Sequence, residues 1–150
     1  KKIKIFIDSN VLIAGLASDR GDSSRLLRLI EEKTFDACLC GLVFEESEKN
    51  IKKKLPGSLS YFYAAIKLLP LMNLPTPKKI DKKLNRFLPK KSDQIIFQTV
   101  QELSPDYFLT LNRKHFHKEA IRKIAHFKIC TPAQFLDEWK EIKISDFNSQ

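Results

Sequence analysis

Acidic side chains stand at three points of the sequence where strands and helices are expected to meet. Asp8 closes a near-continuous apolar run at residues 2–8, Glu45 or Glu46 opens a helix after Gly41, and Asp93 opens another helix. Carboxylates placed a few ångströms apart repel one another and are tolerated together when a cation neutralises them. Oxygen ligands of this kind select Mg²⁺ or Mn²⁺, which activate water for attack on a phosphodiester. If the acids converge, the sequence predicts a metal-dependent nuclease.

Each acid also has a purely structural interpretation. Aspartate is a favoured N-cap residue, so Asp8 is suited to capping the helix that follows it. Asp93 complements the dipole of its own helix, and Glu45 is spaced to pair with Lys49 on the surface. Taken one at a time, these residues leave the structural and the catalytic interpretation open.

The charge balance favours a polyanionic partner. The chain has 27 Lys and Arg against 18 Asp and Glu, a net charge of +9, and the excess is concentrated in short clusters. Such clusters raise the local concentration of nucleic acids, although a solvated lysine surface is the alternative. The clusters lie at residues 52–54, 78–79, 82–83, 90–91, 113–118 and 122–123.

Other chemistries find little support. Four glycines form neither of the usual phosphate-binding loops, and no serine nucleophile motif or Cys/His pair is present. Cys38, Cys40 and Cys130 have the wrong spacing for zinc, so we expect buried thiols. No apolar run reaches the roughly 18 residues of a membrane span, and we expect a cytoplasmic protein.

The hydrophobic pattern alternates strands with helices. Strands are predicted at 2–8, 35–40, 106–111 and 127–130, and helices around Val11–Leu16, at 23–33, from Gly41 to Pro56, at 59–72, from Ser92 and from a Thr131 capping box. This order predicts an α/β class with a mostly parallel sheet, in one domain over residues 1–143 with a frayed tail at 144–150. Sites in such sheets form beyond the carboxyl ends of the strands, where Asp8 and Asn112 stand.

Several segments together resemble the PIN-domain family, above all its toxin members. They are "IFIDSNVLIAGL", "VFEESEKNI", "SDQIIFQTVQE", "DYFLTLNRKHF" and "ICTPAQFL", which occur in the family's order and span nearly the whole chain. The resemblance implies a Rossmann-like, three-layer α/β/α sandwich and a ribonuclease that depends on Mg²⁺ or Mn²⁺.

The resemblance also assigns roles to residues. Asp8 matches the first metal-binding aspartate, Asn10 the asparagine that helps to hold the site together, and Asp93 the third acid. Helix geometry does not choose between Glu45 and Glu46 as the second acid. The family places a glutamate five residues before an aliphatic residue, here Ile51, which favours Glu46 and keeps Glu45 as the alternative.

One position departs from the family. Many members carry a fourth aspartate where this chain has Asn112, whose amide oxygen brings no negative charge. Thr110 is placed to orient a ligand water or a neighbouring carboxylate, with packing on its strand as the alternative. Asn112 leaves single-metal hydrolysis, reduced activity and an altered specificity open, and with them the alternative of a PIN-like module that binds RNA or protein without cutting it.

The expected function is therefore an endoribonuclease that is the toxin component of a toxin–antitoxin pair. Asp8, Glu46 and Asp93 are expected to bind the metal, with Asn112 supporting its hydration shell. His115 and Phe116 are expected near enough to stack on bases. An acidic antitoxin segment across the site and a homodimer through the helix at 59–72 are the expected protein partners. RNA is expected to contact Lys90, Lys91, Arg113, Lys114 and His115.

Overall fold

The computed structural model describes residues 1–150, and its centre is one sheet of five parallel strands. The strand order is β3-β2-β1-β4-β5. The strands are β1 (Lys4–Ile7), β2 (Asp36–Cys40), β3 (Leu71–Leu74), β4 (Tyr107–Leu109) and β5 (Lys128–Cys130). Their residues are largely apolar, as strands buried on both faces require.

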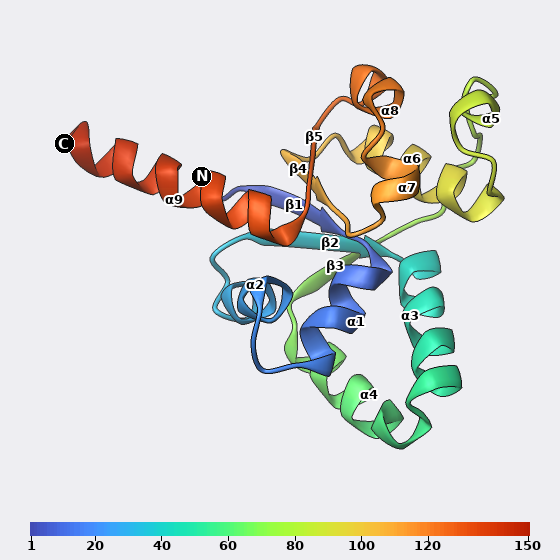
Figure 1. Ribbon diagram of the computed structural model, residues 1–150, viewed down its shortest axis with the longest axis horizontal. Helices are drawn as coiled ribbons and strands as arrows, with labels where there is room; N and C mark the ends of the chain where they lie inside the picture. Colours follow the sequence, from blue (N-terminus) through green and yellow to red (C-terminus); the bar gives the residue numbers. More distant parts are fainter.

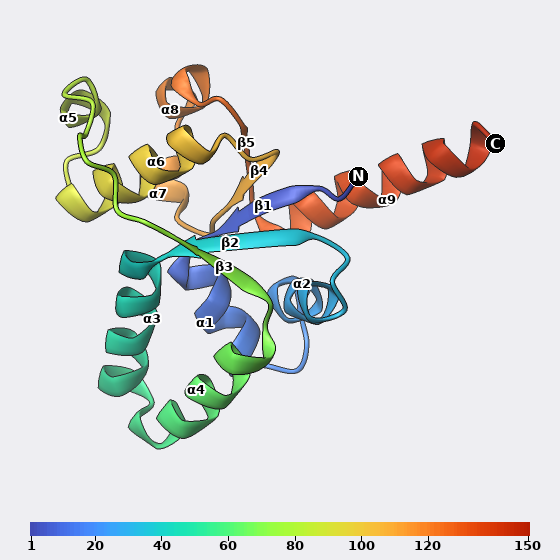
Figure 2. The same ribbon diagram turned by 180° about the vertical axis from the view of Figure 1, so that it is seen from behind.

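Helices cover both faces of this sheet. Chain order runs outward from β1 to β3 and then returns through β4 to β5, so right-handed connections place the two sets of helices on opposite faces. Figures 1 and 2 show the first set on one side and the second set on the other. The first set is α1 (Ser9–Ala17), α2 (Asp22–Glu31), α3 (Gly41–Lys54), the short helix η1 (Pro56–Ser58) and α4 (Leu59–Leu68). The second set is α5 (Leu84–Phe87), α6 (Lys91–Leu103), α7 (Arg113–Phe116) and α8 (Glu119–Ile124).

The expected three-layer α/β/α architecture is thus confirmed. The chain reverses its winding direction between β1 and β4, which lie side by side in the centre of the sheet. The carboxyl ends of two such strands open a crevice where ligands of α/β proteins bind. The three cysteines are buried within the core, as predicted.

Two elements differ from the sequence prediction. The helix expected at 59–72 ends at Leu68, and Leu71–Leu74 forms the edge strand β3, which pairs with β2. Pro70 explains the change, because proline lacks the N–H that continues a helix. The helix expected from Ser92 begins at Lys91, so Ser92 lies inside α6 and does not cap it.

The final helix is longer than predicted. Helix α9 (Pro132–Asn148) begins at the predicted Thr131 capping box and continues through the tail that was expected to fray after Lys143. No proline or glycine follows Pro132, so nothing in the sequence stops the helix. Its last turns project beyond the sheet in Figure 1 and expose Phe147. None of the helices is both long and apolar enough to cross a membrane.

Candidate active site

The crevice between β1 and β4 holds Asp8, which follows β1 directly and is only 3% exposed. One of its oxygens, Oδ1, accepts a hydrogen bond from the Ser9 backbone N–H at 2.8 Å, so Asp8 does cap α1. The other oxygen, Oδ2, accepts from the Thr110 hydroxyl at 2.7 Å. Burial raises the pKa of Asp8, and these hydrogen bonds oppose that rise. Asp8 therefore caps α1 through Oδ1, while Oδ2 is held by Thr110 on the side of the candidate site.

Asn10 and Thr110 brace this carboxylate. The Asn10 amide donates to Asp8 Oδ2 at 3.3 Å, and its oxygen accepts from the Leu111 backbone N–H at 3.0 Å. Asn10 thereby ties the start of α1 to the chain that leaves β4. Thr110 is fully buried, and its hydroxyl also accepts from the Asn112 backbone N–H at 3.0 Å. We call Asp8, Asn10 and Thr110 the Asp8 side of the site.

Glu46 rather than Glu45 approaches the other acids. Glu45 is exposed, whereas Glu46 is partly buried in the second turn of α3 and its Oε1 atom is buried without a hydrogen-bond partner. Burial and then the negative charges of Asp8 and Asp93 raise the pKa of Glu46 to about 7. These couplings indicate that the carboxylates of Asp8, which follows β1, of Glu46 in α3 and of Asp93 in α6 are close enough for their charges to interact. The second acid is thereby assigned a position that helix periodicity left undecided.

Asp93 lies in the first turn of α6 and is also buried. Its Oδ2 atom lies 2.8 Å from His115 Nδ1, on the short helix α7. Burial raises the pKa of Asp93, while the neighbouring His115 and Lys90 oppose that rise. The sequence placed His115 only on the RNA-binding surface, and the structure turns its ring toward an acid instead.

Asn112 caps the helix that carries His115. Its Oδ1 atom accepts a hydrogen bond from the His115 backbone N–H at 3.1 Å, and its amide nitrogen lies 3.2 Å from the His115 ring. We call Asp93, Asn112 and His115 the Asn112 side of the site. The sequence contained a signal for this contact. Asparagine is a favoured N-cap residue, and its side chain accepts a hydrogen bond from the backbone N–H two or three residues later, which here is that of His115.

His117 is a further residue that the sequence did not single out. Its Nε2 atom lies 2.7 Å from the Thr110 carbonyl oxygen, and Arg122 donates to its Nδ1 at 2.8 Å. Because an arginine donates to Nδ1, the ring is neutral and Nε2–H donates to Thr110. Burial lowers the pKa of His117, helped by Arg122 and Arg113. His117 therefore supports the segment after β4 from behind the site.

The donor set suits a hard divalent cation in chemistry. All candidate ligands are carboxylate oxygens, which such cations prefer. The charges of Asp8 and Asp93 repel that of Glu46, and the buried Glu46 Oε1 has no hydrogen-bond partner. No three His, Cys, Asp or Glu side chains are close enough together to hold a metal ion as they stand. The charges of Asp8, Glu46 and Asp93 thus interact, but the three side chains do not form a finished three-ligand site.

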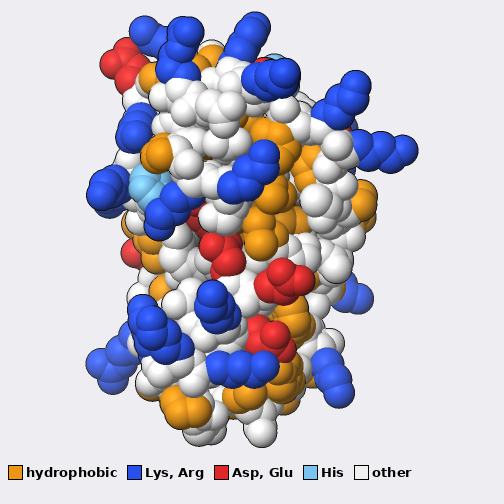
Figure 3. All heavy atoms as spheres, turned by 90° about the vertical axis from the view of Figure 1, so that its right-hand side faces the viewer, with side chains coloured by type: hydrophobic (Ala, Val, Ile, Leu, Met, Phe, Trp, Pro, Cys, Tyr) orange, Lys and Arg blue, Asp and Glu red, His pale blue; other side chains and the backbone are white.

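Basic side chains lie around acidic ones on one face of the molecule. Figure 3 shows acidic side chains near the middle of one face, with lysines and arginines distributed around them. All four basic residues proposed to position RNA are exposed, namely Lys90, Lys91, Arg113 and Lys114. Phe116 does not stack on bases as expected, because it is fully buried and packs edge-on against Phe108.

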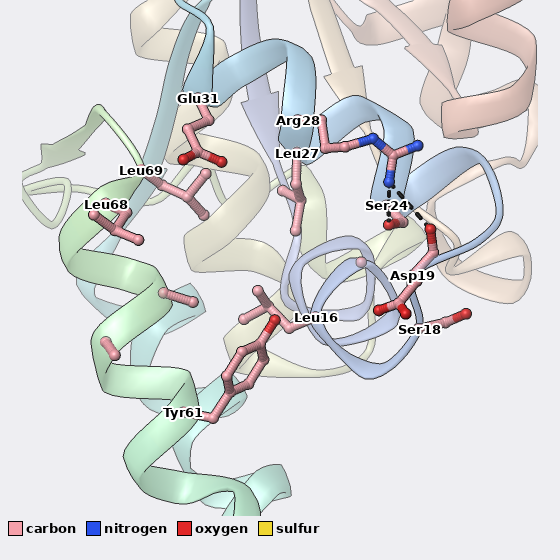
Figure 4. Close-up of a pocket in the computed structure, with 13 residues that line it drawn as sticks. Leu16, Ser18, Asp19, Ser24, Leu27, Arg28, Glu31, Tyr61, Leu68 and Leu69 are labelled. Atoms are coloured by element: carbon pink, nitrogen blue, oxygen red, sulfur yellow. Dashed lines mark hydrogen bonds between the residues drawn. The ribbon is translucent and has the colours of Figure 1, made fainter.

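A second feature of the surface lies away from the acids. Helices α1, α2 and α4 enclose a cavity of about 420 Å³ between Leu16, Leu27 and Leu69 (Figure 4). Tyr61 and Leu68, which also line it, are 60% and 68% exposed. Neither Asp8, Glu46 nor Asp93 lines this cavity, so it is separate from the candidate active site.

Solved structures of toxin–antitoxin complexes contain chains with a similar architecture. A DNA-bound VapBC complex from Salmonella typhimurium matches with a TM-score of 0.63 and 18% identity, over 85% of this chain and 96% of that chain. VapBC2 from Rickettsia felis, bound to a promoter DNA fragment, matches with 0.60 and 12%, over 85% and 97%. A toxin–antitoxin complex from Klebsiella pneumoniae matches with 0.60 and 19%, over the same shares.

The chain has a PIN-like fold. The matches cover nearly the full length of the solved chains, and at these identities they establish the fold alone. No family model and no curated protein matches the sequence. The comparison therefore supports the PIN-like fold, whereas the roles of individual residues are argued from the geometry described above.

Proposed function

We propose that this protein is a metal-dependent ribonuclease of the PIN type that hydrolyses RNA phosphodiester bonds. The observation that carries the proposal is Glu46, whose buried Oε1 lacks a partner and whose pKa is raised to about 7 beside Asp8 and Asp93. Carboxylates whose charges repel one another in this way favour a bound cation that neutralises them. In so basic a protein, acids collected at the one crevice of the sheet are suited to catalysis rather than to stability.

Asp8, Glu46 and Asp93 would hold Mg²⁺ or Mn²⁺. When bound, the cation lowers the pKa of its water and stabilises charge on the phosphate. Asp8 is held in one orientation by Thr110 and Asn10, which fixes the direction from which it meets a ligand. Since Asn112 Oδ1 already accepts the His115 N–H, three carboxylates remain for the metal, and we propose a single cation.

The chain's own cations would position the substrate. Lys90 opposes the rise of the Glu46 and Asp93 pKa values, so its ammonium group lies near both carboxylates. Lys91, Arg113 and Lys114 are exposed at the starts of α6 and α7, on either side of Asp93 and Asn112. A phosphate backbone held by these groups would pass directly over the acids.

RNA cleavage with Mn²⁺ tests this proposal, and neighbouring glutamates provide a matched pair. We expect Asp8→Asn and Glu46→Gln to lower the cleavage rate by more than roughly 100-fold, since each removes a proposed metal ligand. Glu45→Gln should cleave at the wild-type rate, because Glu45 is exposed and outside the crevice. Equal cleavage by Glu46→Gln and Glu45→Gln would refute the assignment of the second acid.

A binding module without catalysis is the second candidate. Two observations favour it: the carboxylates are not gathered into a three-ligand cluster, and Asn112 brings no charge. The same assay separates the two candidates. RNA that stays intact with wild type and with Asp8→Asn, across Mg²⁺ and Mn²⁺, while both proteins bind it, would establish the binding module.

We also propose that the protein is the toxin of a toxin–antitoxin pair and acts in the cytoplasm. Toxin–antitoxin complexes share its fold, and the exposed Tyr61 and Leu68 beside the apolar cavity form the surface that a partner segment would cover. Light scattering on the isolated chain provides the test. A dimer that Leu68→Asp dissociates would assign this surface to the second copy that the sequence predicts, whereas a monomer would leave it free for a partner segment.

A further inference from the structure

The connection between β3 and α6, residues 75–90, carries a concentration of positive charge of which the proposed site uses only Lys90. It contains six Lys and Arg and one Asp, a net charge of +5 within a chain whose total is +9. We propose that this segment, the basic arm, docks the phosphate backbone of an RNA strand and adds affinity without reading sequence. This inference rests on the proposed ribonuclease function.

The basic arm is anchored to the protein and is not a loose linker. Leu84 and Leu88 are 3% and 0% exposed, so the inner side of the arm belongs to the core. Gln94 of α6 donates one side-chain amide to Asn85 Oδ1 at 2.9 Å and to the Leu88 carbonyl at 2.8 Å. Farther along α6, Gln98 Oε1 accepts the Asp81 backbone N–H at 3.0 Å. The arm is therefore a fixed surface that pays little ordering entropy on binding.

The cations of the arm are all exposed, and none of them forms an ion pair. The ion pairs of the chain involve His115, Lys123 and Lys128, and none of them includes a residue of the arm. Like charges this dense repel one another, and an anionic partner relieves that repulsion while releasing counterions. The exposed basic side chains are Lys78, Lys79, Lys82, Lys83, Arg86 and Lys90.

The arm leads to the candidate active site. Its last residue, Lys90, is the N-cap position of α6 and acts on the charges of Glu46 and Asp93. Gln94, which holds the arm, directly follows Asp93. Figure 1 shows α5 beside α6, on the same side of the molecule as the start of α3. A strand lying along the arm would thus be delivered to the acids.

The side chains of the arm suit phosphates better than bases. Lysine is a flexible point charge without the planar geometry that recognises base edges. The single aromatic residue of the arm, Phe87, is partly buried, so no exposed ring is available for base stacking. Contacts of this kind hold RNA of any sequence and weaken steeply with salt. A uniformly charged polymer matches cations spread along the whole segment better than an isolated acidic side chain does.

Charge reversal on the arm tests the inference against a matched control. The test variant is Lys78→Glu, Lys79→Glu and Lys82→Glu, and the control is Lys1→Glu, Lys2→Glu and Lys140→Glu. All six side chains are exposed, and the control residues lie on the opposite side of the molecule, near the N-terminus and α9 in Figure 1. The net charge changes equally in both. Thermal unfolding monitored by circular dichroism checks that both remain folded.

Binding is measured by fluorescence anisotropy in EDTA, with two labelled single-stranded RNAs of unrelated sequence over a range of salt. We expect the test variant to bind both RNAs at least about tenfold more weakly, with the slope of log K against log salt reduced by about 2 for three lost contacts. The control should remain within about threefold of wild type, the change expected from net charge alone.

Each other outcome has a definite meaning. Equal losses in the two variants, or a loss for only one of the RNAs, would overturn the basic arm while leaving cleavage by the wild type intact. If the test variant binds RNA normally but loses binding to poly-L-glutamate, the arm recognises an acidic protein instead. If the wild type neither binds nor cleaves RNA, the proposed function fails together with the inference.

Discussion

The two sides of the candidate site hold their carboxylates by different means. On the Asp8 side, uncharged donors from Ser9, Thr110 and Asn10 meet both oxygens of Asp8, which is thereby fixed. On the Asn112 side, an imidazole lies against Asp93, and Asn112 turns its oxygen to the helix that carries this imidazole. The Asp8 side therefore holds its carboxylate in a fixed orientation. The Asn112 side has a capping amide and a histidine where a further acid was expected.

This difference shows how the site can depart at one position from the pattern of the family that the sequence resembles and still keep its framework. An Asn112 that caps α7 holds the ring of His115 in place, and the ring in turn contacts Asp93. Asn112, which stands where the resemblance predicts an aspartate, thus has a structural function as the N-cap of α7. Between the two sides, Glu46 Oε1 remains without a hydrogen-bond partner, and we propose that Glu46 depends on the cation more than the other acids do.

Among changes to the residues around the three acids, the largest effect should come from removing the Thr110 hydroxyl on the Asp8 side. Thr110→Val deletes the hydroxyl that donates to Asp8 and accepts from the Asn112 N–H, so we expect a loss of about 2 kcal/mol in unfolding free energy. RNA cleavage should fall by roughly 10- to 100-fold as Asp8 loses its orientation. Thr99→Val is the control, since this buried hydroxyl bonds only the Ile95 carbonyl of its own helix. Wild-type cleavage by Thr110→Val would contradict the brace.

Glu46 should destabilise the metal-free protein at high pH. Its pKa is raised from 4.5 to about 7, so the folded state binds an extra proton between these values and loses stability as the pH rises through them. In EDTA at pH 8 we expect Glu46→Gln to gain roughly 1 to 2 kcal/mol after allowance for solvent screening, and to gain nothing at pH 4. Urea unfolding measures this, with Glu45→Gln unchanged at both pH values. An equal gain at pH 4 would show that charge is not the cause.

Restoring an acid should make the Asn112 side resemble the Asp8 side. Aspartate caps helices as well as asparagine does, so Asn112→Asp should keep α7 and add one negative charge beside Asp93. We expect Mn²⁺ to bind about tenfold more tightly, a gain of about 1.4 kcal/mol. Asn112→Ser, which keeps a capping oxygen without charge, should bind Mn²⁺ as the wild type does. Identical affinities of the Asp and Ser variants would remove Asn112 from the site.

The smallest effect concerns His117, which supports Thr110 from behind. Its pKa is lowered in the folded protein, so the unfolded chain binds a proton first and stability falls as the pH drops below about 6.5. His117→Gln should reduce the fall in melting temperature between pH 7.5 and 5.5 by roughly 2 °C. His126→Gln, at an exposed position, should leave the fall unchanged. If the two variants behave alike, protonation of His117 does not contribute to the pH dependence of stability.

The sequence predicts the framework of this molecule better than its details. The apolar runs and the capping box locate four strands and the start of α9, because burial and capping leave strong local patterns. The edge strand β3 is missed, since Leu71–Leu74 continues the apolar pattern of α4 and only pairing with β2 defines it. Helix α9 is predicted too short, as the fraying of a terminus depends on contacts that periodicity does not report.

The candidate site shows the same limit. Asp8 and Asp93 are predicted from their places at the ends of elements, and both lie in the crevice. The preference for Glu46 over Glu45 came from family resemblance, and burial on α3 gives it a physical basis. The inward turn of His115 and the burial of Phe116 were not predicted, because both follow from how α7 packs on Phe108 and Asp93.

Titration of the metal-free protein with Mn²⁺ by calorimetry tests the central claim most directly. We expect one Mn²⁺ per chain for the wild type, and binding at least about tenfold weaker for Asp8→Asn and Glu46→Gln but not for Glu45→Gln. No binding by the wild type, or binding that survives both Asp8→Asn and Glu46→Gln unchanged, would contradict the claim that these carboxylates form a metal site.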